Sequence, residues 1–560
     1  MLPSRILSTL RSPLFGALLF LIVLTAFMTL PQVLHLGTKV AGHPDPFLSM
    51  WRLQWVAHAV PADVSHLFDG NIFAPHLRTL AYSDATLLES AFAAPWLWAH
   101  ANPVLVYNLL LLGGIVASGL GMFVLVRHLT GNVDAALVSA AIFTLVPYRV
   151  EHFMHLELQW TVWMPLSFWA IHRVFEKSTV RRGVVAGAML SLQVLSSMYY
   201  GTFLGIMVAV LVVVLALMQP RAVARVVLPL GIAAIMAAVV TAIYARPYME
   251  NARTLGMRDL GDVSRFSAQL ASYVTAPLQN WVWGWTASRF EGNELRLFPG
   301  VVAVALALLA LVHRPRRRVA WVYVVMTAVA ATLSLGLNGP VYRWMYEHLW
   351  ILGGFRAPAR FAILACCGLA VLAGIGFEYL ERITSARRIR SGLLVVVLVA
   401  VGLECGSGPM YLVDVPATSP VPDVYKFLNS RDRSVVLELP TFLTAEYMYW
   451  SATHWSPLVN GYSGYEPPDY METLKLMRTF PDDEALERLR ELEVRYVLIH
   501  ENYYSTENYK ALMLQILATP ALASHGRYRD WTGWAHVFEL DRAASLRAPV
   551  TRLPEYSTSR

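Results

Sequence analysis

The chain has 560 residues, of which 56% are hydrophobic and 15% are charged. This composition excludes an ordinary soluble enzyme, because many segments reach the roughly 20 apolar residues that cross a bilayer. The net charge of +7 does not indicate a nucleic-acid partner, since the basic residues lie in short loops between apolar segments, where they act as topology signals. The three cysteines lie inside apolar segments, so no disulfide framework or zinc-type spacing is available.

We predict about eleven membrane-spanning helices from segment length and hydropathy. They lie near residues 14–34, 104–126, 133–148, 158–175, 183–198, 201–218, 224–245, 298–313, 319–337, 361–380 and 392–409. The segment 84–100 is shorter and contains Pro95, so the distribution of basic residues has to decide whether it spans. If it lies along the surface, one side of the membrane receives nearly all loop cations, including Arg5 and Arg11. The sequence therefore predicts a cytoplasmic N-terminus and a C-terminus outside.

Four large pieces are expected on the outer side: residues 35–103, 246–297 and 338–360, and the tail from about residue 410. The first, residues 35–103, is predicted to carry two interfacial helices, near 47–60 and 84–100, with tryptophan at the depth that it prefers. The second, residues 246–297, is rich in aromatic residues and has little helical periodicity. We expect it to be either a cover over a site or another interfacial segment.

An acidic residue stands between two prolines just after the first span, in the stretch Gly42-His43-Pro44-Asp45-Pro46. A residue before proline is biased toward extended geometry, so the pattern predicts Asp45 on a stiff turn outside the helix that follows. An aspartate that only caps this helix is the alternative interpretation.

The composition changes near residue 411, where the apolar segments end. Buried strands are predicted at 434–439, 494–499 and 535–540, and helices at 467–479, 482–492 and 506–518. Alternating strands and helices indicate a small α/β domain outside the membrane. We therefore divide the chain into a membrane domain, 1–410, and an extracytoplasmic domain, 411–560. The second domain contains no phosphate-binding glycine loop or nucleophile elbow.

Ionisable residues cluster after the third predicted span, at Glu151, His152, His155 and Glu157. If this stretch is helical, the two histidines share a face. Such clusters at membrane depth usually face a cavity or one another. Three interpretations are open: a divalent metal shared by the histidines, a carboxylate–imidazole pair without metal, or a solvated loop.

Two arginines, Arg356 and Arg360, open the tenth predicted span around Pro358. A helix start presents free N–H groups and a positive dipole, so with two guanidinium groups it forms a site for a phosphate or carboxylate. The alternative is that both side chains extend to lipid headgroups. Tyr199 and Tyr200, at the turn between the fifth and sixth spans, either line the same cavity or act as interfacial aromatics.

A loop in the C-terminal domain gathers aromatic and polar residues, among them Trp455, Asn460, Tyr462 and Tyr465. Flat aromatic faces beside hydrogen-bonding groups suit a sugar, so these residues are candidates for binding an acceptor. Packing of the C-terminal domain onto the membrane domain explains the same residues.

With these features in place, the chain resembles the GT-C superfamily of membrane glycosyltransferases. Members have a first helix, a long outer loop with an early acid and two interfacial helices, and often a soluble outer domain. The stretches that carry the likeness are Asn102–Arg149, His152, His155–Trp160, Ser197–Gly201 and Arg356–Phe361, and they look like a group of bacterial members.

The resemblance implies a polyprenyl-phosphate-linked sugar as donor, and a glycan, lipid or protein as acceptor on the outer face of a bacterial inner membrane. Asp45 matches the acid that acts as general base, although many relatives carry a pair of acids there. Arg356 and Arg360 would bind the donor phosphate and stabilise its departing charge in one inverting displacement, with His43 in the same pocket. No cofactor is predicted, and a divalent metal stays open.

Two other function classes remain open from the sequence. A transporter or flippase for a lipid-linked glycan would also bind phosphate, but it predicts ionisable residues near the midplane of several spans. A non-catalytic assembly factor would use the outer domain to bind a partner, and it needs no Asp45.

Overall fold

The computed structural model describes residues 12–256, 258–292, 294–416 and 420–541. Arg5 and Arg11, which entered the charge distribution above, lie outside the described residues. The chain forms two compact units. The first contains the chain up to Ala41, Thr86–Glu89 and Asn108–Val413, and the second contains Gly42–Ala85, Ser90–Tyr107 and the chain from Asp414.

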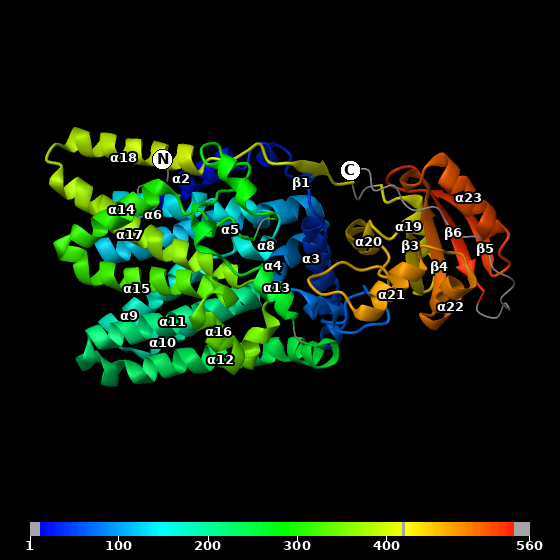
Figure 1. Cartoon of the computed structure of the whole chain (residues 1–560), viewed down its shortest axis with the longest axis horizontal. Coiled ribbons are helices and arrows are strands. Elements are labelled where there is room, and N and C mark those ends of the chain that lie inside the picture. The colour runs from blue at the N-terminus through cyan, green and yellow to red at the C-terminus, as the bar shows by residue number, and fades with distance from the viewer. Residues whose placement is uncertain (1–11, 257, 293, 417–419, 542–560) are drawn as a thin grey trace, which may run out of the picture. The chain divides into compact units, whose positions relative to one another are not determined.

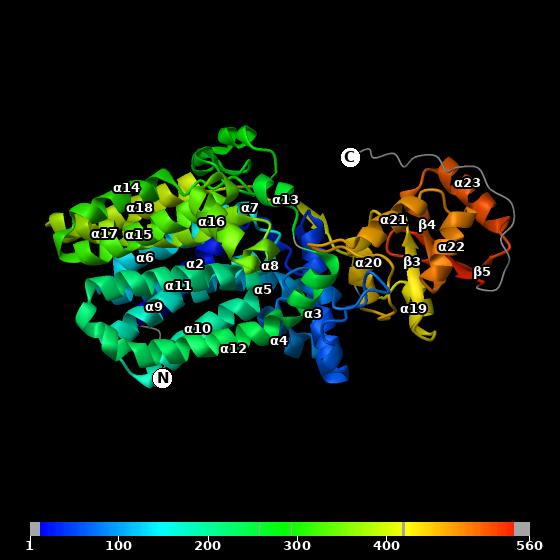
Figure 2. The same cartoon turned by 60° about the horizontal axis from the view of Figure 1, so that its bottom comes forward.

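The first unit is helical, and its helices are drawn in Figures 1 and 2. They are α2 (Pro13–Met28), α5 (Pro103–Thr130), α6 (Val133–Leu145), α7 (Tyr148–Glu151), α8 (Leu156–Gln159), α9 (Trp163–Glu176), α10 (Val180–Ser196), α11 (Met198–Met218), α12 (Val223–Leu255), α13 (Leu260–Arg265), α14 (Val301–Val312), α15 (Arg317–Ser334), α16 (Pro340–His348), α17 (Ala362–Ile383) and α18 (Arg387–Cys405). A two-stranded sheet joins β1 (Lys39–Ala41) to β2 (Leu412–Asp414).

Every predicted span coincides with a helix: α2, α5, α6, α9, α10, α11, α12, α14, α15, α17 and α18. Among the described residues, five helical stretches are long and apolar enough to cross a membrane, namely Pro103–Thr130, Val133–Glu151, Met198–Met218, Pro220–Leu255 and Pro358–Ile383. A helical membrane protein is therefore confirmed.

Helix α17 forms the core of the first unit. Of the 18-residue apolar stretch within Pro358–Ile383, 89% is buried inside the protein. It packs against α6, α14 and α15. Helix α12 is the opposite case, because only 17% of the 18-residue apolar stretch within Pro220–Leu255 is buried. It packs on α10 along one side, as both views show, and its exposed face carries Leu228, Ile235 and Ile243. An apolar face of this kind suits contact with lipid.

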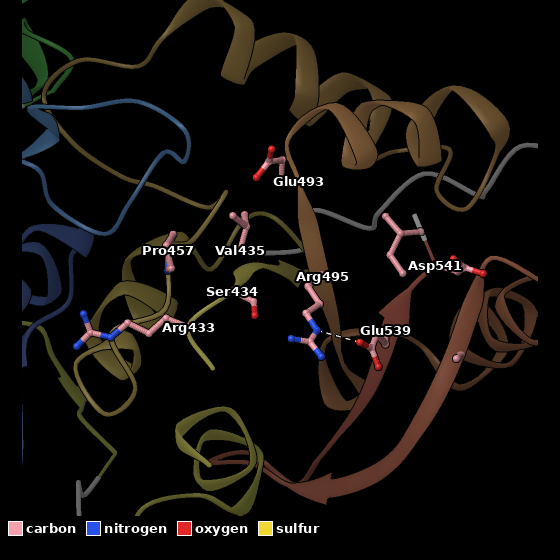
Figure 3. Close-up of a pocket in the computed structure, with 10 residues that line it drawn as sticks. Arg433, Ser434, Val435, Pro457, Glu493, Arg495, Glu539 and Asp541 are labelled. Carbon is pink, nitrogen blue, oxygen red and sulfur yellow. Dashed lines mark hydrogen bonds and ion pairs between the residues drawn. The ribbon is translucent and has the colours of Figure 1, made fainter. Parts of the chain in front are cut away.

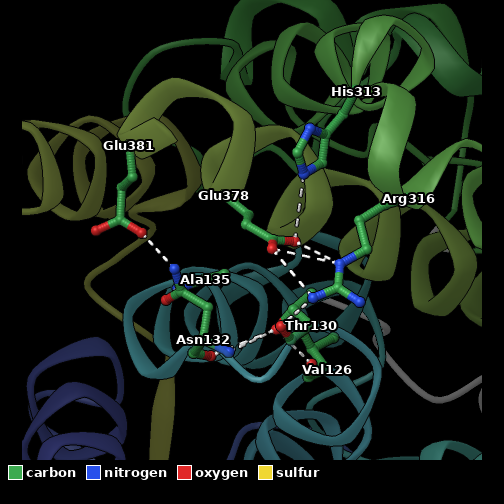
Figure 4. A network of polar contacts seen from close by, with 8 residues as sticks. All are labelled: Val126, Thr130, Asn132, Ala135, His313, Arg316, Glu378 and Glu381. Atoms are coloured by element: carbon green, nitrogen blue, oxygen red, sulfur yellow. Dashed lines mark hydrogen bonds and ion pairs between the residues drawn. The ribbon is translucent and has the colours of Figure 1, made fainter. Parts of the chain in front are cut away.

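A polar network ties together one end of this helical unit (Figure 4). The Arg316 guanidinium contacts the Glu378 carboxylate, with Nε 3.2 Å from Oε2, and it also donates to the Thr130 carbonyl. On the neighbouring turn, Asn132 donates to Glu381 over 2.6 Å. The turns after α5 and α14 are thus both fastened to the last part of α17.

The segment around the histidines is not one continuous helix but two short ones, α7 and α8. The cause is visible in the Gln159 side chain, whose amide donates to the carbonyls of Arg149 and His152 over 3.2 and 2.8 Å. A side chain that occupies these carbonyls replaces the backbone bonds of a continuous helix. Helix α12, in contrast, continues to Leu255, well past the predicted end of its span at 245.

The second unit contains α3 (Pro44–Ala62), most of α4 (Leu87–Trp98) and the elements of the C-terminal region. The latter are α19 (Asp423–Asn429), β3 (Val435–Leu439), α20 (Thr444–Ser451), α21 (Pro468–Leu476), α22 (Asp483–Glu491), β4 (Val494–His500), α23 (Thr506–Leu517), β5 (Leu522–Arg529) and β6 (Trp534–Leu540). Both helices expected in the first outer loop, and the three strands and three helices expected beyond residue 411, are present.

The sheet of the second unit is mixed, with strand order β3-β4-β6-β5. Strand β3 pairs parallel with β4, with Leu437 opposite Val497, and β6 is antiparallel to both of its neighbours. The apolar face of the sheet packs against α22 and α23 through residues such as Leu489 and Ile516. Strand β5 was not predicted, because its sequence Leu-Ala-Ser-His-Gly-Arg-Tyr-Arg is polar and lies at the sheet edge.

The other edge of this sheet is extended by residues 457–459, and beyond them by a segment of the first outer loop. Beside β3, Val436 exchanges backbone hydrogen bonds with Pro457 and Val459. On the far side of that segment, the Leu458 N–H donates to the Asn71 carbonyl over 2.9 Å, and the Ala74 N–H donates to the Leu458 carbonyl over 2.8 Å. The first outer loop is therefore part of the same compact unit as the C-terminal sheet.

Candidate functional site

Asp45 lies in the first turn of α3, so the expectation of a non-helical turn is wrong. The helix begins at Pro44, and the preceding His43 is extended and caps it by accepting the Asp45 N–H at Nδ1 over 3.2 Å. Prolines are tolerated in a first turn, because the N–H that they lack has no partner within the helix there. An acid in this turn also interacts favourably with the helix dipole.

Tyr462 and His43 both contact the Asp45 carboxylate. The Tyr462 hydroxyl donates to Oδ1 over 2.8 Å, and His43 Nδ1 lies 3.3 Å from Oδ2. The side chain is 13% exposed, so the carboxylate keeps some access to its surroundings. The structure therefore brings together the predicted base, the predicted pocket histidine and one predicted acceptor residue.

The other three acceptor candidates make packing contacts within the second unit. Asn460 is fully buried and bonds both backbone groups of Glu438 over 2.8 Å each. Trp455 stacks on His58, with ring centroids 4.3 Å apart. Tyr465 meets the Tyr82 ring edge-on at 5.9 Å. The contacts of Trp455 and Tyr465 fasten the aromatic loop to the first outer loop, and those of Asn460 fasten it to β3.

In the first unit, Arg360 forms a buried ion pair with Glu294. Its Nε lies 3.2 Å from both carboxylate oxygens, and the two side chains are 8% and 10% exposed. Burial by itself would raise the pKa of Glu294, but the Arg360 charge outweighs it and holds that pKa well below its usual range. Glu294 was not identified from the sequence, since an acid in a long aromatic loop gives no signal of its distant partner.

Aromatic and imidazole groups surround this ion pair. The Tyr199 ring lies against Arg360, 5.1 Å from centroid to Cζ, and its hydroxyl accepts the Ala357 N–H over 2.9 Å. His152 Nε2 lies 3.8 Å from Glu294, and burial lowers the pKa of His152 to about 3, which keeps the ring neutral. Tyr200 is buried with its hydroxyl 3.0 Å from that of Tyr148.

Three pocket candidates remain: Glu151, His155 and Glu157. Glu151 pairs with Arg296, with Oε1 3.2 Å from Nη1. The His155 ring lies 5.7 Å from that of His152, and Glu157 is buried in α8. In the part of the chain that the structure describes, no group of three or more His, Cys, Asp or Glu side chains is placed to hold a metal ion.

Arg356 differs from Arg360 in its surroundings. It is half-buried, with its guanidinium over the Phe266 ring at 5.6 Å from the centroid. Within the described residues, the structure shows no acidic side chain paired with it. The segment that contains Arg258 adjoins this loop, since the Arg258 backbone N–H donates to the Gly353 carbonyl over 3.2 Å. Arg356 can therefore offer positive charge to an anion without first breaking an ion pair that the described residues show.

A polar cleft of about 720 Å³ opens at the sheet of the second unit (Figure 3). Arg433, Arg495, Glu493 and Glu539 line it. Arg495 Nε lies 2.9 Å from Glu539 Oε1, so part of the charge in the cleft is neutralised internally. The lining of the cleft, which also includes Asp541, therefore carries charges of both signs.

No family model and no curated protein matches the chain. Among solved structures, the mycobacterial arabinofuranosyltransferase AftD is similar, with a TM-score of 0.60 at 14% identity over 94% of this chain. The match takes in 40% of AftD, so the chain spans less than half of that protein. ArnT from Cupriavidus metallidurans bound to undecaprenyl phosphate gives a TM-score of 0.49 at 11% identity, over 96% of this chain and 98% of ArnT. The chain therefore shares the fold of AftD, as the sequence resemblance led us to expect.

Proposed function

We propose that the chain transfers a sugar from a polyprenyl-phosphate-linked donor to an acceptor outside the cytoplasm. The observation that supports this most is the shared fold with an arabinofuranosyltransferase across 94% of the chain. The nature of the donor comes from the sequence resemblance. A lipid-linked donor also agrees with a chain that has many apolar helices and no recognisable nucleotide-binding loop.

Asp45 is proposed as the general base. It accepts the proton of the acceptor hydroxyl while that oxygen attacks the anomeric carbon, and the bond from this carbon to the phosphate oxygen breaks with inversion. A general base must be a positioned proton acceptor. The hydrogen bond from Tyr462 and the contact with His43 supply the positioning, and the residual exposure of the carboxylate leaves room for the hydroxyl.

Arg356 is proposed as the direct ligand of the donor phosphate. The leaving phosphate departs with the electron pair of the broken bond, so a guanidinium at its oxygens stabilises the charge that develops. Arg360 is proposed to act through the same loop, because Glu294 already neutralises it and holds it in place. In this proposal Arg356 binds the donor phosphate, and Arg360 holds the loop in place through Glu294.

All eleven helices that coincide with the predicted spans are proposed to cross the membrane, with the N-terminus in the cytoplasm and the second unit outside. Five helical stretches are by themselves long and apolar enough to cross a membrane, which supports this proposal. The shorter helices pack against them in the same bundle. The distribution of loop cations supplies the direction.

The test is sugar transfer by the purified chain in proteoliposomes, with radiolabelled polyprenyl-phosphate sugars offered one at a time. Transfer of label to a glycan, lipid or protein acceptor would support the proposal. No transfer from any of these donors, together with movement of a labelled lipid-linked glycan between leaflets, would instead support the transporter.

A further inference from the structure

The first unit has a second cationic region, at the opposite end of the α9–α10 pair from Arg360. Helix α9 starts close to Thr161, which accepts a hydrogen bond from Arg149 beside the histidine cluster, and it runs about 21 Å to its last residue. At that far end lies a cavity of about 410 Å³. Trp169, Arg173, Lys177, Thr179, Arg181 and Arg182 line it.

Two of the four cations are held in fixed positions. Arg173 lies over the Trp169 ring, 5.5 Å from Cζ to centroid, and Arg182 Nη1 donates to the Lys177 carbonyl over 3.3 Å. Both also approach the Glu176 carboxylate, at 3.6 and 3.9 Å. Glu176 is shared further, since His128 Nε2 lies 2.7 Å from it.

The other two cations, Lys177 and Arg181, are exposed, and the described part of the chain shows no acidic partner for either. The cavity lining thus contains four positive side chains, and within the described residues Glu176 is the one carboxylate that two of them approach. The cavity therefore has an excess of positive charge. Thr179 adds the start of α10, where its side chain accepts the Arg182 N–H over 3.4 Å. A topology signal requires positive charge in a loop, but it requires neither a cavity nor guanidinium groups held over a ring.

We propose that this cavity binds a phosphate group, either in the headgroup of an anionic lipid or in a soluble phosphate compound. Guanidinium groups match phosphate oxygens bidentately, and holding them in advance lowers the entropy lost on binding. Basic pockets between membrane helices are known sites for anionic headgroups. Val180 and Val184, next to the cavity, are 52% and 40% exposed and offer an apolar surface for acyl chains.

The test uses the full chain in detergent micelles and the double variant Lys177→Gln/Arg181→Gln, which removes two exposed charges. The matched control is Arg387→Gln/Arg388→Gln, which removes two exposed arginines at the start of α18, outside the cavity lining. Native mass spectrometry would measure binding of phosphatidylglycerol, with phosphatidylcholine as the zwitterionic comparison. Inorganic phosphate would be added as a competitor.

We expect phosphatidylglycerol to bind the wild type and the control alike, and to bind the double variant about 30-fold more weakly, since each basic residue near an anionic lipid contributes about fivefold. Displacement of the lipid by millimolar phosphate would assign the site to a soluble phosphate compound, and resistance to phosphate would assign it to the lipid. Equal binding by the double variant and the control, or equal binding of the two lipids, would overturn the proposal. Matching thermal unfolding of both variants would show that the loss is not misfolding.

Discussion

Replacing Glu294 with glutamine would test the ion pair that anchors Arg360. Both side chains are buried, at 10% and 8% exposure, so the value for removing one partner of a buried pair applies, about 3–5 kcal/mol of unfolding free energy. The variant keeps the shape of the side chain but leaves the Arg360 charge without its carboxylate. The assay is urea unfolding in mixed micelles, followed by tryptophan fluorescence.

The control for this prediction is Glu291→Gln, which changes an exposed carboxylate in the same loop and should alter the unfolding free energy by less than about 0.5 kcal/mol. The double variant Glu294→Gln/Arg360→Met should recover part of the loss, because it leaves no unpaired charge. Since Arg360 depresses the pKa of Glu294, the stabilisation should be complete above the ordinary value of 4.5 and fall at lower pH. Equal unfolding midpoints for Glu294→Gln and Glu291→Gln would refute the reasoning.

Three further predictions concern the other clusters. Tyr462→Phe should lower kcat for sugar transfer about tenfold with little change in KM, because the Asp45 carboxylate loses its donor; Tyr411→Phe, at an exposed position, should leave kcat unchanged. Arg356→Gln should raise the KM for the donor roughly 10–100-fold, whereas the exposed Arg253→Gln should not, and an unchanged KM would remove Arg356 from the phosphate site. Burial lowers the pKa of His500, but its contacts with Asp530 and Glu438 outweigh burial, so the pKa is raised. The second unit should therefore lose stability as pH rises from 6 to 9, and His500→Gln should abolish this pH dependence.

The sequence was sufficient wherever a local pattern carried the information. Spanning helices such as α5 and α11 follow from runs of apolar residues, and β4 follows from a short buried run of branched residues. The first helix of the first outer loop followed from the helical spacing of Phe47, Met50, Trp51 and Trp55. Strand β5 lacked such a pattern, because an exposed edge strand does not require apolar alternation.

Contacts between distant residues were beyond a local pattern. The hydrogen bond from Tyr462 to Asp45 joins residues 417 positions apart, and the pair of Arg360 with Glu294 joins residues 66 positions apart. Each residue type was interpretable by itself: an acid suited to be a base, an arginine suited to bind phosphate. What the sequence could not supply is which partner each one meets, and that decides whether Arg356 or Arg360 is available to a ligand.

The most direct test of the account is sugar transfer by Asp45→Asn, measured beside Asp63→Asn. Asp63 is an exposed aspartate that follows the last turn of the same helix, so its variant controls for the loss of one carboxylate in the first outer loop. If Asp45 is the general base, Asp45→Asn should lose about 10²–10⁴-fold in kcat, the usual contribution of such a base, and Asp63→Asn should keep wild-type transfer. Wild-type kcat in Asp45→Asn would contradict the assignment of the base.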